Sequence, residues 1–365
     1  MEMKMTRRML AGMGVALLFA AIPVTGTAQQ LTTVREPDAV VAGSADQKPE
    51  TPTPVLQQAR SQGVGVSTRR RRPSVVGYID DSTIESKVRI RFDSATGTTV
   101  PDRAEFLYAK CGCYRDISHS DPKYDPSAPG PRPGVANGVD YRQLYLEGEL
   151  AFDTRLSVFG QIPVRWLEPT SFVANAAPSF TNATGISDVR GGIKLGLSDP
   201  ASPYTLTGKV QLYLPTGDAA KGLGTHHTSV EPSMLFQGEL TPTVMLESQV
   251  GVWLPIGGAA PLPGTTADHF AGRILYYGIG PSVTIYETNH LKVMPVVELV
   301  GWRVLAGNQT TAVGPSDASG TNIVNIKFGA RIGYDAGSFY VGVGKALTDA
   351  KWYDNILRFE YRYAF

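Results

Sequence analysis

The alternation of apolar and polar positions is sharpest at the end of the chain. Between Leu357 and Phe365 every second residue is apolar or aromatic, and the opposite face is charged, with Arg358, Glu360 and Arg362. A period of two predicts a β-strand. An apolar outer face opposite a charged one is typical of a strand that lies between lipid hydrocarbon and a water-filled interior. In a membrane, such a strand must belong to a closed barrel. The last strand of a soluble sandwich or barrel is the alternative.

The same alternation recurs along most of the chain from Ile84 onward. It predicts strands near 84–92, 141–152, 154–166, 186–198, 203–214, 227–240, 243–255, 270–286, 290–304, 322–335, 338–347 and 353–365. We therefore predict an all-β fold, a transmembrane antiparallel up-and-down β-barrel of about twelve strands over residues 76–365. The weakly alternating stretch 103–110 leaves the strand count open by two.

The connections between these strands alternate in length. Short ones rich in turn formers occur at 153–154, 198–202, 241–242, 287–289 and 335–337. Long ones occur at 93–140, 167–185, 215–226, 256–269 and 305–321, with 348–352 as a shorter exception. The short set shares the side of the C-terminus, as expected for periplasmic turns opposite external loops. Segment 93–140 is thus predicted to be a long first external loop.

The face opposite the apolar one gives the predicted lining of the lumen, in which both signs of charge are mixed. The predicted pore-lining residues are Glu147, Arg155, Asp188, Arg190, Lys194, Lys209, Glu231, Glu247, Glu298, Lys327, Arg331, Arg358, Glu360 and Arg362, joined by the aromatic Tyr145, Tyr213, Trp253 and Tyr276. Such a lining suits a narrow polar pore or a salt-bridged core that blocks the barrel. The sequence leaves both open, and also whether 93–140 folds into the lumen.

The N-terminal residues predict export. Basic residues precede an apolar run from Met9 to Val24, and Gly26 and Ala28 offer a cleavage site, so residues 1–28 are predicted to be a signal peptide. Residues 29–75 are rich in Pro, Gln, Thr and Ser without alternation, which predicts a disordered periplasmic leader. After Ala28 no stretch of about 18 apolar residues follows, so no membrane helix is expected. The predicted location is the outer membrane of a Gram-negative bacterium.

Composition and candidate chemistry add little to this prediction. A formal net charge of +1 gives no reason to expect nucleic acid as a partner. The cysteines Cys111 and Cys113 could join His119 and Asp121 in a zinc site, but Cys-x-Cys in an exported chain favours a local disulfide. We predict no metal and no cofactor. The expected partners are outer-membrane lipids, the barrel-assembly machinery and a small-molecule solute.

One short motif resembles a catalytic site. The run His227-Thr228-Ser229 is similar to the His-x-Ser of outer-membrane phospholipase A, itself a twelve-stranded barrel. No Gly follows Ser229 at that family's spacing, and no clear Asn stands on the next strand to orient the histidine. The strand phase also points Ser229 into the lumen, away from lipid. A polar strand entrance is therefore the favoured interpretation, and no enzyme activity is predicted.

Two further resemblances concern the barrel itself. Tyr361, Tyr363 and Phe365 resemble the aromatic ending of the closing strand in outer-membrane barrels, where it implies an assembly signal. The runs Gly185-Ile186-Ser187-Asp188, Gly192-Ile193-Lys194-Leu195, Leu214-Pro215-Thr216-Gly217-Asp218 and Gly222-Leu223-Gly224-Thr225 resemble the outer-membrane transporter family associated with phenol meta-pathway degradation.

That second resemblance covers about 140–365 and implies passive uptake of small, aromatic solutes. We therefore expect an outer-membrane channel or transporter. The alternatives are a phospholipase-type barrel enzyme and a plugged structural or adhesive barrel without transport.

Overall fold

A computed structural model describes residues 72–98, 118–120, 136–172, 182–225, 227–256, 272–311 and 314–365. The predicted signal peptide, nearly all of the predicted leader and the Cys111–Cys113 pair lie outside these residues. No helix in the described ranges is long and apolar enough to cross a membrane.

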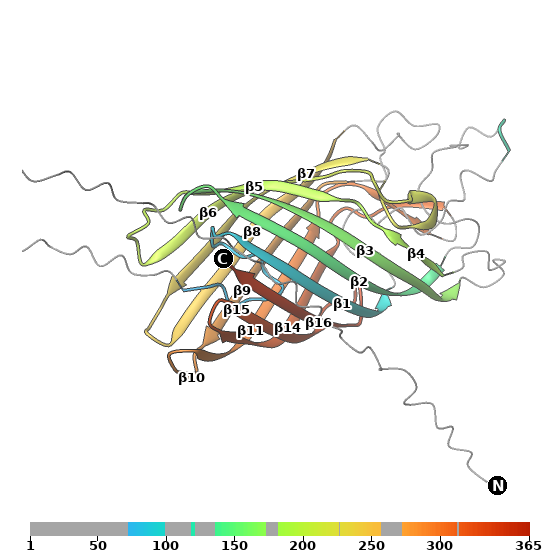
Figure 1. Ribbon diagram of the computed structural model, residues 1–365. Coiled ribbons are helices and arrows are strands. Elements are labelled where there is room, and N and C mark those ends of the chain that lie inside the picture. Colours follow the sequence, from blue (N-terminus) through green and yellow to red (C-terminus); the bar gives the residue numbers. More distant parts are fainter. Residues whose placement is uncertain are drawn as a thin grey trace, which may run out of the picture. The chain divides into compact units, whose positions relative to one another are not determined.

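The wall is a closed antiparallel β-barrel (Figure 1). Its strands are β1 (Lys87–Thr98), β2 (Ala136–Ala151), β3 (Leu156–Phe172), β4 (Ala183–Ile186), β5 (Arg190–Gly196), β6 (Tyr204–Tyr213), β7 (Thr228–Glu239), β8 (Val244–Ile256), β9 (Ile274–Val283), β10 (Tyr286–Glu287), β11 (Leu291–Val304), β14 (Asn322–Tyr334), β15 (Gly337–Ala346) and β16 (Asn355–Ala364). Because β4 leads into β5 along β3, and β10 continues β9 along β11, the barrel has twelve passes.

The barrel closes where its first and last strands pair. In β1 and β16, Ile90 lies opposite Tyr361 and Arg89 opposite Arg362, so apolar residues meet apolar ones and charged meet charged. Beyond this pairing, Phe365 N–H donates a 3.0 Å hydrogen bond to the Ser86 carbonyl. We call the barrel end that contains Ser86 and Phe365 the terminal rim, and the opposite end the far rim. The predicted all-β barrel of twelve antiparallel strands is confirmed.

Strand boundaries differ most where loops were predicted. β1 continues to Thr98 and β2 begins at Ala136, so both ends of the predicted loop 93–140 belong to the wall. The predicted strand 186–198 is interrupted between β4 and β5, because Asp188 turns inward to bind loop residues instead of continuing the strand ladder. At the far rim, β6 is followed by a 3₁₀ turn (Ala219–Lys221). β11 is followed by a hairpin of β12 (Asn308–Thr311) and β13 (Gly314–Asp317).

The two faces of the wall separate as the alternation predicts. On β16, Phe359 and Tyr363 are 41% and 45% exposed, while Glu360 between them is 1% exposed. The same exposed apolar belt includes Val88, Ile90, Leu146, Ile162, Ile193, Leu212, Val250, Ile279, Leu299, Phe328 and Val341. A belt of this kind suits contact with acyl chains and leaves the ionic side chains inside the barrel.

Residues 73–86, which we call the lumenal segment, lie inside the barrel ahead of β1. Val75, Val76 and Ile79 are buried there, with at most 2% exposure, and pack with Met294 and Tyr340 of the wall. This placement was not predicted, because residues 29–75 contain no strand pattern and 76–83 are too short to show one. The material described inside the lumen comes from this segment, while 93–98 and 136–140 are wall strands.

Candidate functional site

Most of the predicted pore-lining residues point into the barrel. Those buried within it are Arg190, Lys194, Lys209, Glu231, Glu247, Glu298, Lys327, Arg331, Arg358, Glu360 and Arg362, and the side chain of Glu147 is 9% exposed. Arg155 does not belong to this set, because β3 begins only at Leu156 and leaves Arg155 exposed in the turn. Asp188 is buried but lies between β4 and β5, where it accepts hydrogen bonds from Gly217 and Thr225 of the far-rim loop.

Carboxylates of the wall bind the backbone N–H groups of the lumenal segment. Glu298 on β11 accepts hydrogen bonds from Gly77, Tyr78 and Ile79 at 2.8 to 2.9 Å. Glu247 on β8 accepts two more, from consecutive N–H groups at 75 and 76, at 3.0 and 2.9 Å. A buried carboxylate needs such donors, because removing it from water without them costs several kcal/mol.

Guanidinium groups of the wall bind the carbonyl groups of the same segment. Arg331 on β14 donates to the Val75 and Val76 carbonyls at 2.9 and 2.8 Å, and Arg358 on β16 donates to the Gly77 carbonyl. Arg362 on β16 adds a 3.0 Å bond to the Val76 carbonyl. The wall thus binds both N–H and C=O groups of the segment. The segment therefore needs no regular secondary structure to satisfy its backbone hydrogen bonds.

Two aspartates of the segment pair with basic side chains of the wall. Asp80 lies 2.7 Å from Lys209, and Asp81 lies 2.5 Å from Lys87 and 3.2 Å from Arg362. Burial alone would raise the pKa of Asp81, but the charges of Lys87, Arg362 and Lys194 outweigh it and hold that pKa well below its ordinary value. Asp81 is therefore ionised at neutral pH, and it places a negative charge in a basic part of the lumen.

Tyr78 contacts side chains and backbone of three neighbouring strands of the wall. Its ring lies 3.8 Å from the Lys327 ammonium and 4.1 Å from the Arg358 guanidinium, and it meets Tyr340 edge to face. Its hydroxyl donates to the Gly342 carbonyl at 3.2 Å. Cations at these distances are attracted by the ring quadrupole. Tyr78 therefore fixes the turn of the segment against β14, β15 and β16.

The charged face of β1 completes the lumen wall and was absent from the predicted lining. Its members are Lys87, Arg89, Arg91 and Asp93, which alternate with Val88, Ile90 and Phe92. Arg89 pairs with Glu147 and Glu360, and Arg358 binds Asp93 through two hydrogen bonds of 2.6 and 2.7 Å. The alternation in 87–93 was a sufficient signal for these residues, since that strand was itself predicted.

Toward the far rim the interior becomes apolar and aromatic. We call this part the far-rim aromatic cluster: Tyr141, Tyr213, Trp253, Trp302, Trp352 and Tyr353. The rings of Trp302 and Trp352 lie 4.8 Å apart, and Trp352 reaches the interior from the connection between β15 and β16. The barrel thus holds ionic groups at mid-depth and near the terminal rim, and aromatic groups toward the far rim.

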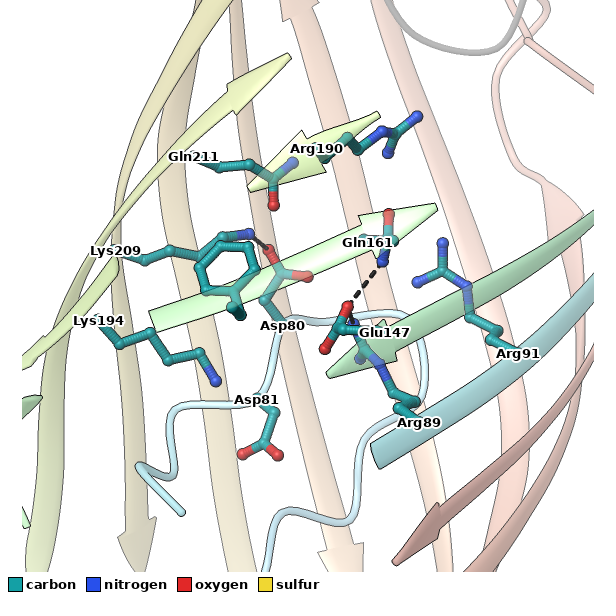
Figure 2. Close-up of a pocket in the computed structure, with 11 residues that line it drawn as sticks. Asp80, Asp81, Arg89, Arg91, Glu147, Gln161, Arg190, Lys194, Lys209 and Gln211 are labelled. Atoms are coloured by element: carbon teal, nitrogen blue, oxygen red, sulfur yellow. Dashed lines mark hydrogen bonds and ion pairs between the residues drawn. The ribbon is translucent and has the colours of Figure 1, made fainter. Parts of the chain in front are cut away.

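A small cavity remains between the lumenal segment and the strands β1, β2, β3, β5 and β6 (Figure 2). Five basic and three acidic side chains are among the residues that line it: Arg89, Arg91, Arg190, Lys194, Lys209, Asp80, Asp81 and Glu147. Its volume is about 30 Å³, which accommodates about two water molecules. A larger cavity of about 770 Å³ opens at the terminal rim, between the lumenal segment and the turns that follow β10 and β14.

The structure places the residues of the possible catalytic motif, His227 and Ser229, at the start of β7 and on its inner face. The ring Nδ1 of His227 lies 2.9 Å from the Thr225 carbonyl oxygen, and the ring meets Trp253 edge to face. Ser229 is fully buried on the inner face of β7, which is the placement expected for a polar strand entrance. No group of three or more metal-binding side chains occurs among the residues that the structure describes.

The aromatic residues at the end of the chain lie on the lipid-type face. Tyr361, Tyr363 and Phe365 are exposed, with Tyr361 against Phe339 of the neighbouring strand at a ring distance of 5.2 Å. This placement leaves them accessible at the terminal rim. Their predicted part in assembly stays a prediction.

Comparisons with known proteins find solved structures of similar fold but no matching family. No family model matches this sequence, and no curated protein matches it. Among solved structures, an outer membrane channel from Pseudomonas putida F1 is similar over 80% of this chain and 99% of its own, at 13% identity and a TM-score of 0.46.

Two further solved barrels are similar at comparable levels. The β-domain of a Bordetella autotransporter matches over 77% of this chain and all of its own, at 13% identity and a TM-score of 0.43. The porin NanC matches over 77% of this chain and all of its own, at 7% identity and a TM-score of 0.40.

Proposed function

We propose that this protein is a bacterial outer-membrane channel that passes small solutes passively through a narrow, partly occupied lumen. The observation that supports it is the combination of an apolar outer belt with an interior of ionised side chains. In hydrocarbon such a wall must close on itself, and its polar side must face water or protein. On this proposal the terminal rim is periplasmic, the far rim is external, and the predicted signal peptide delivers the chain to the membrane.

The lumenal segment sets the size of what can pass. It occupies mid-depth, and the cavity left beside it holds about two water molecules. Because its polar contacts to the wall are hydrogen bonds and ion pairs, which water can replace once the segment moves, displacements of the segment widen the passage. The proposal therefore expects low and fluctuating conductance, and it distinguishes this barrel from an open porin.

The solute class is proposed from the far-rim aromatic cluster. Trp253, Trp302 and Trp352 form the apolar interior toward the far rim, and a solute that displaces part of this packing meets ring surfaces, which favour aromatic solutes. The resemblance to the transporter family associated with aromatic-compound degradation leads to the same class. We therefore propose that the channel preferentially transports small aromatic solutes.

Planar-bilayer recording of the full-length protein tests the channel function. We expect small unitary currents in potassium chloride that appear only after insertion of folded barrel. The matched control is the same protein unfolded by heat before addition. Absence of current at every voltage, with folded barrel shown to be present in the bilayer, would establish a plugged barrel and overturn the proposal.

Uptake into vesicles tests the solute class separately. Liposomes that contain the barrel should admit benzoate or phenol faster than a straight-chain solute of similar mass, such as hexanoate or hexanol. Equal rates for the ring and the chain would contradict the aromatic preference and leave the channel function intact. Liposomes without the barrel correct for direct permeation of the bilayer.

A further inference from the structure

Arg91 is a buried cation that does not use all of its hydrogen-bond donors within the protein. It lies on the inner face of β1 and is only 9% exposed, and its Nε makes no hydrogen bond to any residue that the structure describes. The guanidinium lies 3.6 Å from the centre of the Tyr145 ring. A ring attracts the charge, but it does not replace an acceptor for the Nε–H group.

The carboxylate that pairs with Arg91 is shared with a second arginine. Asp93 lies 3.6 Å from the Arg91 Nε, and Arg358 binds the same carboxylate through two hydrogen bonds of 2.6 and 2.7 Å. All three side chains are buried. Two guanidinium groups and one carboxylate leave a positive charge without a counterion in this group. A buried charge of this kind costs free energy until an anion pairs with it.

The acidic side chains that line the neighbouring cavity have cationic partners of their own. The pairs are Glu147 with Arg89, Asp80 with Lys209, and Asp81 with Lys87. None of these carboxylates is therefore available to Arg91 alone. The charge of Arg91 remains uncompensated where its side chain borders the cavity.

The cavity that Arg91 borders has room for a small ion (Figure 2). Its volume is about 30 Å³, which accommodates about two water molecules. Chloride is only slightly larger than a water molecule and fits, whereas an anion of many heavy atoms, such as gluconate, does not. Gln161 borders the same cavity and donates one amide N–H group to Glu147 at 2.7 Å. Its second N–H group is a donor for an ion beside Arg91.

From these contacts we infer that the cavity binds a small inorganic anion of the size of chloride, with Arg91 and Gln161 as its donors. The ion accepts hydrogen bonds from the guanidinium and the amide, and it supplies the negative charge that Arg91, Asp93 and Arg358 lack together. The inference goes beyond the proposed channel function, because an ion bound at this site stabilises the folded barrel whether or not solutes pass.

Reversible urea unfolding of the full-length protein in vesicles tests the site without requiring transport. Sodium chloride replaces sodium gluconate at constant ionic strength, so that only the anion changes. A ligand that binds the folded state and not the unfolded one raises the stability of the folded state. We expect the urea midpoint to rise with the chloride concentration. An equal midpoint in both salts at every concentration would overturn the inference.

Substitutions locate the site. Arg91→Gln should abolish the chloride-dependent rise, because it removes the charge that attracts the ion. Arg155→Gln is the matched control: it removes a positive charge from an exposed position in the β2–β3 turn and should keep the rise of the wild type. A rise in Arg91→Gln as large as in the wild type would refute the site. A loss in Arg155→Gln as large as in Arg91→Gln would show non-specific attraction and refute it equally.

Folding of the variants is checked by the heat-dependent shift in electrophoretic mobility that closed barrels show. If Arg91→Gln does not fold, Gln161→Leu keeps every charge and removes one donor to the ion. The chloride concentration that gives half of the rise should then increase several-fold in Gln161→Leu. An unchanged chloride dependence in that variant would overturn the site.

Anomalous diffraction from crystals of the full-length protein in bromide gives the position of the ion directly. We expect a bromide peak within hydrogen-bond distance of Arg91 and Gln161. Bromide peaks confined to the outer surface would refute the site. Bilayer recordings test the channel independently, so currents without chloride-dependent stability would remove the site and keep the channel.

Discussion

At the scale of single residues, Glu298 has the largest share in holding the lumenal segment. Its two oxygens accept three consecutive backbone N–H groups and the Tyr340 hydroxyl, the latter at 3.0 Å. It is fully buried, so no water is available to replace these donors in the docked state. One carboxylate thus fixes the backbone from Gly77 to Ile79, and the position of Tyr78 follows from it.

Glu298→Gln should loosen the segment while the barrel still folds. The amide has one acceptor oxygen in place of two and no charge, so about 1 to 3 kcal/mol of docking free energy is lost. We expect larger and more frequent current fluctuations in bilayers. Glu168→Gln, at an exposed glutamate of β3, is the control and should record as the wild type does. If the currents of Glu298→Gln fluctuated no more than those of the wild type, this carboxylate would not restrain the segment.

Asp81 predicts how docking depends on pH. Its pKa in the docked segment lies well below the ordinary value of 3.8, because the neighbouring cations outweigh the effect of burial. A depressed pKa gives stability that is fully present above the ordinary value and is lost as the pH falls through the depressed one. The contribution of Asp81 to docking should therefore be constant from pH 8 to about pH 5, and its loss should raise the conductance only below about pH 4. Asp81→Asn should remove part of the rise below about pH 4, and an undiminished rise in that variant would contradict this assignment.

At the scale of elements, the strands of the wall could be predicted from the sequence, but the lumenal segment could not. Each strand carries its own signal, since apolar residues such as Ile90 and polar ones such as Arg89 alternate with period two. The lumenal segment has no period, because its peptide groups bind side chains of distant strands instead of a neighbouring strand. Such partners, 150 or more residues away in most of these contacts, leave no local pattern to read.

The candidate site was predictable only in part, for a related reason. The phase of each strand identified Arg190, Lys194 and Lys209 as inward residues, and all three border the cavity. Which partner each charge has depends on neighbours across strands and on Asp80 of the lumenal segment. That information lies in the tertiary arrangement, so Arg91 could not be distinguished from Arg89 beforehand.

A disulfide between the segment and the wall tests whether the segment must move. A Cβ at Gly278 would come within 2.9 Å of the Ile79 side chain, so Ile79→Cys with Gly278→Cys brings two thiols together. In a background with Cys111→Ser and Cys113→Ser, oxidation should suppress the currents and reduction should restore them. The Ile79→Cys single variant is the control. Undiminished conductance in the oxidised form would show that solutes pass without displacement of the segment.

At the scale of the whole molecule, the apolar belt requires a lipid environment. Phe328 lies midway along β14 with half of its surface exposed, and Phe328→Arg should cost about 2 to 4 kcal/mol of unfolding free energy in a bilayer. Tyr334→Arg at the terminal rim should cost about 0 to 1 kcal/mol. Reversible urea unfolding in vesicles measures both. Equal losses at the two positions would argue against a membrane-embedded wall.

The partners of the lumenal segment have a consequence for the order of biogenesis. Val75, Val76 and Gly77 are held chiefly from β11, β14 and β16, strands that the ribosome makes last. A chain still lacking those strands offers Val75 and Val76 the Glu247 carboxylate of β8 but none of the arginines that bind their carbonyl groups, although the segment itself was translated first. Complete docking of residues 75–77 therefore has to wait for the final hairpins, so the segment cannot reach its final place before the barrel wall is nearly complete.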